Sequence, residues 1–343
     1  MKLGQATIKD IARELNVSSS TVSRALKDYP GISDETKRKV KELAEKLNYR
    51  PNAVALSLRK SKTFTIGVII PEVVHFFFST VISGIEEVAF SNGYNVILCQ
   101  TNEKLTREQS SIETMLSNQI DGFLVSFSRE TTDFQHFKKL LDLGFPIVFF
   151  DRLPDLEKTV NVTVNDYQGA YDAVKHLIDQ GYRKIIHLSG PQNLNISKQR
   201  RGGYVDALKS AGIEPQADWI IECPYGTEKE SFEIASQLFK NPDNRPDAIF
   251  AHHDIVAVGA MMALKNLGLE IPNDVGVVGF SNWQFSSMID PPLSTVSQPG
   301  FKIGEQAAKL LIEMIDRKKT EPMEPKDIIL DTELLVRKSS VKV

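Results

Sequence analysis

Polar side chains follow several of the apolar, strand-like runs in this sequence of 343 residues. PIVFFD ends in Asp151 before Arg152, AIFAHHD ends in His253-Asp254, and GVVGFS ends in Ser281. Carboxylate, imidazole and hydroxyl groups can hold the hydroxyl groups of a polyol by hydrogen bonds. Polar residues are also common in ordinary loops after strands, so these positions alone leave a generic loop as the alternative.

A second group of polar side chains lies near the N-terminus, in 17-VSSSTVSRALK-27, where five of eleven residues are Ser or Thr. Ser18 or Ser19 can cap a helix that continues to about Leu26 and buries Val22 and Ala25. Short hydroxyl side chains would let the outer face of this helix enter a groove of DNA, and an arginine can bind guanine through two hydrogen bonds. The outer face comprises Ser19, Ser20, Thr21, Ser23 and Arg24. Hydroxyl groups that only cap and solvate a small helix are the alternative.

Two further helices are predicted around this one. Thr7 followed by Asp10 is a capping pattern, and the apolar residues after it recur at helical spacing, which predicts a helix over about 8–15. Ser33 begins the third helix, SDETKRKVKELAEKLN, whose apolar stripe is formed by Val40, Leu43, Ala44 and Leu47. Three short helices with the tight turn NVS between the first two predict a helix-turn-helix unit. We call residues 1–50 the head.

Charge is distributed unevenly along the chain. Residues 1–62 hold fourteen Lys or Arg and seven Asp or Glu, a net charge of +7, whereas the remaining residues hold 27 basic and 37 acidic side chains, a net charge of −10. A basic segment at 1–62 followed by an acidic remainder indicates a polyanion partner for the N-terminal segment alone. A solvated helical bundle rich in lysine would carry the same charge.

The segment 51-PNAVALSLRKSK-62 predicts one helix that is too short to be stable alone. Such a segment could fold only when it meets DNA and a partner copy, which would make binding depend on the spacing of two bodies. An ordinary interdomain linker is the alternative.

From Thr63 onward, apolar strand-like runs alternate with helical stretches. The runs are TIGVIIP, YNVILCQT, DGFLVSF, PIVFFD, KIIHLSGP, WIIECP, AIFAHHD and GVVGFS. Continuous apolar strands are typical of parallel sheets that are buried on both faces, so the pattern predicts an α/β fold. The length is too great for one sheet of usual size, which favours two subdomains with a ligand cleft between them.

Three motifs resemble the LacI/GalR family of bacterial transcription regulators: TIKDIA, VS-x-x-TVSR and NYRPNAVA, in that order and spacing, and the similarity continues over essentially the whole chain. The resemblance implies a three-helix head, a hinge helix and a two-subdomain, periplasmic-binding-protein-like (type I) body. We therefore expect the head at 1–50, the hinge at 51–62 and the body at 63–343. Within the body we expect an N-subdomain at about 63–163 and 293–323, and a C-subdomain at about 164–292 and 324–340.

The resemblance also implies contacts with operator DNA. Ser19 and Ser20 would read bases in the major groove, and the hinge helix would pair with its twofold mate and wedge Leu58 between base steps in the minor groove. Ser19 and Ser20 are shorter than the usual reading residues of the family, which leaves the operator sequence open. The full set of expected DNA-binding residues is Thr7, Ser19, Ser20, Thr21, Ser23, Arg24, Tyr49, Asn52, Ala55 and Leu58.

For the body, the resemblance implies an effector in the cleft between subdomains, with Phe77 and Phe78 stacking on it and Arg200 of R-x-x-G-Y holding it. Asp151, His253 and Ser281 would line the rim. Many relatives carry Asn-Pro where this chain has His75-Phe76, and an Asp in place of Ser281. A sugar or sugar derivative is therefore an expectation from the family, and the effector's identity is open.

An enzyme is not predicted, because the sequence has no P-loop, no G-x-S-x-G elbow and no Cys-His arrangement. No cofactor and no metal are expected: Cys99 and Cys223 lie far apart in strand-like surroundings, and the adjacent His252 and His253 would point to opposite faces of a strand. The N-terminus lacks an apolar signal stretch, and no run of eighteen apolar residues occurs, which predicts a cytoplasmic protein without a membrane partner.

The prediction is thus a DNA-binding transcriptional regulator, of the repressor type, controlled by a small-molecule effector. A homodimer on a pseudopalindromic operator is expected, because one small head buries too little surface to be selective in a genome. The alternatives are a sugar-binding protein of a transport system, which the helix-turn-helix and the missing signal disfavour, and a sugar-modifying enzyme of the cytosol.

Overall fold

The computed structural model describes residues 6–49, 62–317 and 324–342. The chain divides into two compact units, Met1–Phe64, which contains the head, and Thr65–Val343, which contains most of the body. The predicted hinge at 51–62 lies outside the described residues except for Lys62. Among the described residues, no helix is both long and apolar enough to span a lipid bilayer.

The head contains the three predicted helices, α1 (Ile8–Glu14), α2 (Ser19–Ala25) and α3 (Asp34–Lys46). Thr7 and Asp10 form the expected capping box, and the Ser18 hydroxyl accepts a hydrogen bond from the Thr21 N–H at 3.0 Å. Asn16, at φ 51°, turns the chain between α1 and α2 in the left-handed region that asparagine tolerates. The core that joins the three helices comprises Ile11, Ala12, Val22, Ala25, Val40, Leu43 and Ala44. The helix-turn-helix prediction is confirmed.

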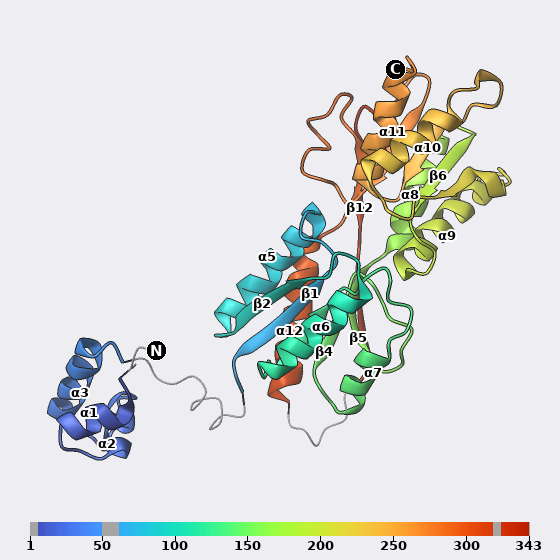
Figure 1. The fold of residues 1–343 in the computed structure, drawn as a ribbon. Coiled ribbons are helices and arrows are strands. Elements are labelled where there is room, and N and C mark those ends of the chain that lie inside the picture. Colours follow the sequence, from blue (N-terminus) through green and yellow to red (C-terminus); the bar gives the residue numbers. More distant parts are fainter. Residues whose placement is uncertain (1–5, 50–61, 318–323, 343) are drawn as a thin grey trace. The chain divides into compact units, whose positions relative to one another are not determined.

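The body is built on two six-stranded sheets (Figure 1), one for each subdomain. The N-subdomain sheet has the order β11-β5-β4-β3-β1-β2, and all its strand pairs are parallel. Its strands are β1 (Thr65–Ile70), β2 (Asn95–Gln100), β3 (Gly122–Val125), β4 (Ile147–Phe150), β5 (Val160–Val164) and β11 (Lys326–Leu330). The helices of the N-subdomain are α5 (Phe76–Ser91), α6 (Leu105–Ser117), α7 (Gln135–Asp142) and α12 (Gly300–Asp316).

The C-subdomain sheet has the order β12-β10-β9-β8-β6-β7, in which only the β10–β12 pair is antiparallel. Its strands are β6 (Ile185–Ser189), β7 (Ile220–Glu222), β8 (Ala248–Ala251), β9 (Gly276–Phe280), β10 (Ser294–Ser297) and β12 (Glu333–Leu335). Its helices are α8 (Asp166–Asp179), α9 (Asn195–Ser210), α10 (Glu228–Leu238) and α11 (Asp254–Asn266), with short 3₁₀ turns at Ala217–Trp219 and Pro242–Asn244. The eight predicted strands are all present, so the α/β fold is confirmed.

Two strands lie in the opposite subdomain from the one predicted. The expected boundaries placed 293–323 in the N-subdomain, but β10 pairs with β9, and its first three residues are buried in the C-subdomain sheet. They also placed 324–340 in the C-subdomain, but β11 pairs with β5 in the N-subdomain sheet. The chain passes from one subdomain to the other only after a strand is complete, at the ends of β5, β10 and β11. The predicted boundaries instead lay before β10 and before β11.

Helices α8 and α9 pack so closely that glycine is required at one position of the R-x-x-G-Y motif. A Cβ on Gly203 would lie 2.2 Å from the Tyr167 carbonyl oxygen, whereas a Cβ on its neighbour Gly202 would find nothing nearer than 3.4 Å. Gly203→Ala is therefore expected to lower the free energy of unfolding by about 1–3 kcal/mol through overpacking. Gly202→Ala should raise it by about 0.5–1 kcal/mol, because alanine loses less entropy in a helix. Urea denaturation of both variants tests this pair, and equal stabilities would contradict it.

Candidate functional site

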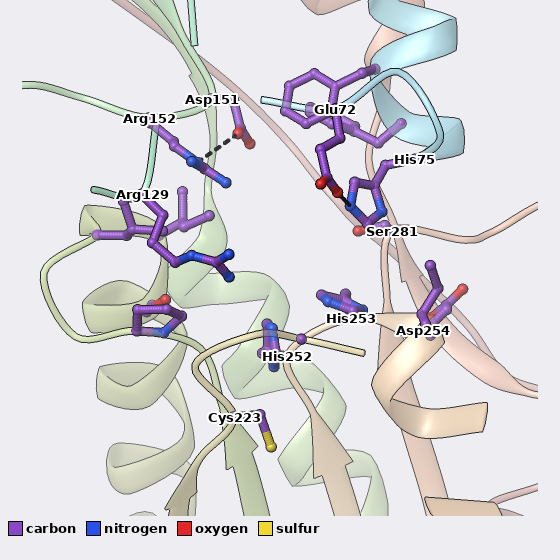
Figure 2. Close-up of a pocket in the computed structure, with 18 of the residues that line it drawn as sticks. Glu72, His75, Arg129, Asp151, Arg152, Cys223, His252, His253, Asp254 and Ser281 are labelled. Atoms are coloured by element: carbon purple, nitrogen blue, oxygen red, sulfur yellow. Dashed lines mark hydrogen bonds and ion pairs between the residues drawn. The ribbon is translucent and has the colours of Figure 1, made fainter. Parts of the chain in front are cut away.

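A cavity of about 300 Å³ lies where the carboxyl ends of strands from both subdomains meet (Figure 2). All six side chains that sequence analysis proposed for an effector line it: Phe77, Phe78, Asp151, Arg200, His253 and Ser281. The wall also includes Glu72, His75, Phe76, Glu103, Arg129, Arg152, Leu194, Ser197, Cys223, Tyr225, His252, Asp254, Trp283 and Gln298. The structure thus brings the six residues together, and their contact with an effector remains a prediction.

The aromatic part of the wall begins at the N-terminus of α5. The rings of Phe77 and Phe78 pack edge to face with centroids 5.2 Å apart, and Phe78 also packs on Phe150. Both side chains are buried, at 9% and 5% exposure, so most of each ring is held by the fold. Phe76 and Trp283, which sequence analysis did not select, add aromatic surface to the same cavity.

Arg200 is held by a buried carboxylate. Its Nε and Nη2 atoms donate to Asp166 Oδ1 at 2.8 and 2.7 Å, and its guanidinium lies 3.7 Å from the centroid of the Phe280 ring. Nη1 donates to the His252 carbonyl. Burial raises the pKa of Asp166, although the Arg200 charge opposes the rise. Arg200 is therefore fixed at the wall by the protein itself, and it is pre-positioned rather than free to swing.

Three histidines line the cavity. The sequence prediction that His252 and His253 point to opposite faces is wrong, because β8 ends at Ala251 and both rings line the cavity, with centroids 4.2 Å apart. Burial lowers the pKa of His252 to about 3 and that of His253 well below 6.5. Both imidazoles are therefore neutral near pH 7. His252 Nδ1 donates to the Leu188 carbonyl at 3.1 Å, which leaves its Nε2 as an acceptor. His253 Nδ1 accepts from the Val256 N–H at 3.4 Å, which leaves its Nε2–H as a donor. In the described part of the chain, no three His, Cys, Asp or Glu side chains are grouped to hold a metal ion.

Two carboxyl groups of the wall have raised pKa values. Burial raises the pKa of Asp151 to about 6, opposed by the Arg152 charge, and Asp151 itself adopts φ 65° at the end of β4. Burial also raises the pKa of Asp254 to about 6. Asp254 accepts hydrogen bonds from the Trp283 N–H and from the hydroxyls of Ser286 and Thr295, so it fixes the loop after β9.

Arg129 is a basic wall residue that sequence analysis missed, as it missed the acidic Glu72 and Glu103. Arg129 lies four positions after the end of β3, and Figure 2 shows its guanidinium directed toward the middle of the cavity. Nη1 donates to the Pro224 carbonyl, and the guanidinium lies 5.9 Å from the Tyr225 ring centroid. The available signal was its place after the run DGFLVSF, since polar residues after parallel strands share one edge of the sheet.

The predicted DNA-binding face of the head lies on α2 and at the helix ends. Ser19, Ser20 and Arg24 are exposed, and Thr21 and Ser23 are partly exposed. Exposed Thr7 caps α1, whereas Tyr49 is half-buried against the head core, and its burial raises its pKa. The other three predicted residues, Asn52, Ala55 and Leu58, lie outside the described residues. Three of the four α3 lysines are paired with carboxylates, Lys37 with Asp34, Lys39 with Glu35 and Lys41 with Asp28, whereas the fourth, Lys46, is exposed in the last turn.

A helix-turn-helix head joined in one chain to a two-subdomain body with a ligand-sized cavity defines a class of DNA-binding regulators that respond to small molecules. Residues 7–52 match the bacterial regulatory proteins of the lacI family, and residues 63–335 match the periplasmic binding proteins and sugar binding domain of the LacI family. The chain belongs to the LacI family.

Two relatives align with this chain over nearly its whole length. The chain is 34% identical over 340 residues to the HTH-type transcriptional repressor PurR of Mannheimia succiniciproducens, covering 98% of this chain and 99% of that one. It is 36% identical over 313 residues to catabolite control protein A of Priestia megaterium, covering 91% and 93% of the two chains. Among solved structures it resembles a complex of the transcriptional regulator CelR with cellobiose, at 26% identity, a TM-score of 0.73 and coverage of 97% and 99%.

These findings define the functional class of the protein. It is a ligand-regulated, DNA-binding transcriptional repressor of the LacI family, and it is not an enzyme.

Proposed function

We propose that this protein represses transcription by binding a specific pseudopalindromic operator, and that a sugar or sugar derivative in the cavity sets its affinity for that operator. The observation that carries the proposal is the pairing, in one chain, of an exposed Ser, Thr and Arg face on α2 with a cavity walled by both subdomains. Its place of action would be the bacterial cytoplasm, where operator DNA is found.

The chemistry of the wall supports a polyol as the effector. Neutral imidazoles, hydroxyls and carboxyl groups offer donors and acceptors between aromatic surfaces, which is the combination that sugar rings require. The similar regulator CelR was solved with cellobiose, which supports a carbohydrate as the effector class for this chain.

The test is a gel shift of the full chain on promoter fragments, including the fragment upstream of its own gene, repeated with a panel of sugars and sugar phosphates. The proposal expects a discrete shifted band on one fragment and a change in its affinity with at least one compound. Binding that does not discriminate between fragments would refute the operator proposal, and indifference to every compound would refute the effector proposal.

Arg24→Ala is expected to weaken operator binding by about 1–3 kcal/mol, because a guanidinium can bind a base edge through two hydrogen bonds. Arg24 is exposed near the C-terminal end of α2 and lies 5.6 Å from the Tyr29 ring centroid, so its removal leaves the head core intact. Arg38→Ala on α3 is the matched control, since Arg38 is already paired with Glu42 at 3.3 Å. Fluorescence anisotropy with labelled operator measures both, and equal losses in the two variants would count against the α2 docking face.

We further propose that the functional unit is a homodimer formed through the body. The edge strand β2 of the N-subdomain exposes Ile97 and Leu98, at 37% and 41%, and Phe90 at the end of α5 is 83% exposed. Val73, which is 46% exposed, lies beside the other end of β2, because its N–H donates to the Gln100 side chain. An exposed apolar edge strand is a site where another chain adds or packs, and a twofold copy of the same edge would cover it.

Leu98→Glu should convert the dimer into a monomer at micromolar concentration, because it places a charge in the middle of this edge. Leu143→Glu is the control, since Leu143 is an equally apolar residue, 82% exposed, just after α7. Sedimentation velocity of the parent and both variants decides the question. A monomeric parent, with and without operator, would refute the dimer.

The proposed domain division assigns operator contacts to the head at 1–50 and to a hinge helix at 51–62, and assigns effector binding and dimerisation to 63–343. Effector and operator would then be linked through the relative rotation of the subdomains, which changes the separation of the two hinges in a dimer. Linkage requires each ligand to change the affinity for the other by the same factor. The corresponding coupling free energy is typically about 1–3 kcal/mol.

A further inference from the structure

Two of the three arginines of the cavity wall are neutralised by carboxylates of the protein. Arg152 binds Glu103 through two nitrogens, each at 2.8 Å, and Arg200 binds Asp166 through two nitrogens at 2.7 and 2.8 Å. On the acidic side, the Glu72 carboxylate lies 3.1 Å from the ring of His75.

Arg129 is the exception among the three arginines of the wall. Among the described residues, no Asp or Glu carboxylate forms an ion pair with its guanidinium, which has only the Pro224 carbonyl and the face of Tyr225 as partners. Its backbone is nevertheless fixed: the N–H donates to Glu103 Oε2 at 2.6 Å, and the carbonyl accepts from the Asn193 amide at 2.7 Å. The site therefore presents a positioned guanidinium that no carboxylate contacts directly, although its charge helps to lower the pKa values of Glu103 and Glu130.

A second observation adds an unused donor to the same wall. Arg152 has a side chain that is 10% exposed, and its Nε has no hydrogen-bond partner among the described residues. The nearest carboxylate oxygen, on Asp151, is 3.9 Å from this nitrogen. A buried donor without an acceptor is costly, so a local shift that brings this nitrogen to an acceptor on a bound molecule would stabilise the site.

Helix termini reinforce this charge. The first turns of α5 and α9 line the cavity, and neither His75 nor Leu194, their N-caps, provides a side-chain cap. The positive ends of two sixteen-residue helices and their unsatisfied N–H groups favour negative charge in the cavity.

We infer that the effector carries an anionic group, a phosphate or a carboxylate, that Arg129 binds with help from the Arg152 Nε donor. This inference rests on the proposed function of the cavity as the effector site. It makes Arg129 the residue that distinguishes an anionic sugar derivative from the neutral sugar, because only an anion adds a charge–charge attraction to the hydrogen bonds that the guanidinium donates.

The test is calorimetric titration of the full chain with matched pairs of compounds: glucose and glucose 6-phosphate, ribose and ribose 5-phosphate, galactose and galacturonate, with inorganic phosphate as the minimal probe. We expect at least one anionic member to bind about ten- to hundredfold more tightly than its neutral partner. Inorganic phosphate alone should bind in the millimolar range. Phosphate and carboxylate pairs together identify which anion the site prefers.

Arg129→Gln should remove the preference for the anion and the phosphate binding. Arg129→Lys should keep part of both, because lysine keeps the positive charge but lacks the planar pair of N–H donors of a guanidinium. Arg107→Gln is the control, since Arg107 is an exposed arginine of α6 in the same subdomain and does not line the cavity. Thermal unfolding of each variant establishes that it is folded.

Three outcomes would overturn the inference: neutral members that bind as tightly as their anionic partners, no binding of any anion including phosphate, or an anion preference that survives in Arg129→Gln. Each is separable from failure of the proposed function, because a neutral sugar that changes operator affinity leaves the effector site intact. Conversely, phosphate that binds through Arg129 without any compound changing operator affinity would support the anion site and refute the effector proposal.

Discussion

Arg200→Ala is expected to lower the free energy of unfolding of the body by about 3–5 kcal/mol. The substitution leaves Asp166, which is 4% exposed, as a buried carboxylate whose strongest partner is gone. It also removes the guanidinium that lies against the Phe280 ring. Urea denaturation followed by circular dichroism measures the loss.

The adjacent Arg201→Ala provides the control, since Arg201 is exposed on the same helix and should change stability by no more than about 0.5 kcal/mol. Replacing both partners, in Asp166→Leu with Arg200→Met, should recover much of the loss, because no buried charge remains. An Arg200→Ala variant as stable as Arg201→Ala would mean that the Arg200–Asp166 pair does not stabilise the subdomain. Loss of the effector response in Arg200→Ala is interpretable only at temperatures where the variant is folded.

Asp151→Asn is expected to stabilise the protein in a pH-dependent manner. The pKa of Asp151 is about 6 in the folded protein, above the ordinary value of 3.8, so the folded state holds this proton more tightly than the unfolded state. Its contribution to the parent's stability is present in full below about pH 4 and is lost as the pH rises to about 6. The difference in unfolding free energy, variant minus parent, should therefore grow by about 3 kcal/mol over this range and stay constant above it.

Asparagine suits this test because it tolerates the left-handed backbone of Asp151, at φ 65°, as well as aspartate does. Other titrating groups are common to both proteins and cancel in the difference. Asp155→Asn, at an exposed position in the loop after β4, is the control. A difference that does not vary between pH 4 and 7 would mean that Asp151 is not buried as a carboxyl group in the folded protein.

The strands that sequence analysis identified share one property: they are continuous apolar runs, as expected for sheets covered on both faces. Strand β5 was missed because its sequence, VNVTV, alternates polar and apolar residues although all five are buried. Asn161 can be buried there because its amide donates to Thr159 and Asp327. Those partners, one of them 166 positions away, are invisible to local periodicity.

Site residues at strand ends could be predicted from the sequence. Site residues whose positions depend on tertiary contacts could not. Asp151 and Ser281 directly follow strands and His253 lies two residues after one, so their convergence follows from parallel topology. The pairing of Arg200 with Asp166 and the isolation of Arg129 depend on how α8, α9 and the loop after β3 meet, which no local pattern encodes. The histidine prediction was wrong for a related reason: strand alternation was applied two residues beyond the end of β8.

The order in which strands enter the two sheets has a consequence for synthesis on the ribosome. The N-subdomain sheet is completed by β11 at Lys326–Leu330, and the C-subdomain sheet by β12 at Glu333–Leu335, although their first strands are made much earlier. Domains usually fold as units while translation continues. Here neither subdomain can close its sheet until nearly the whole chain has been translated, so a premature stop just before residue 326 would leave both subdomains unfinished.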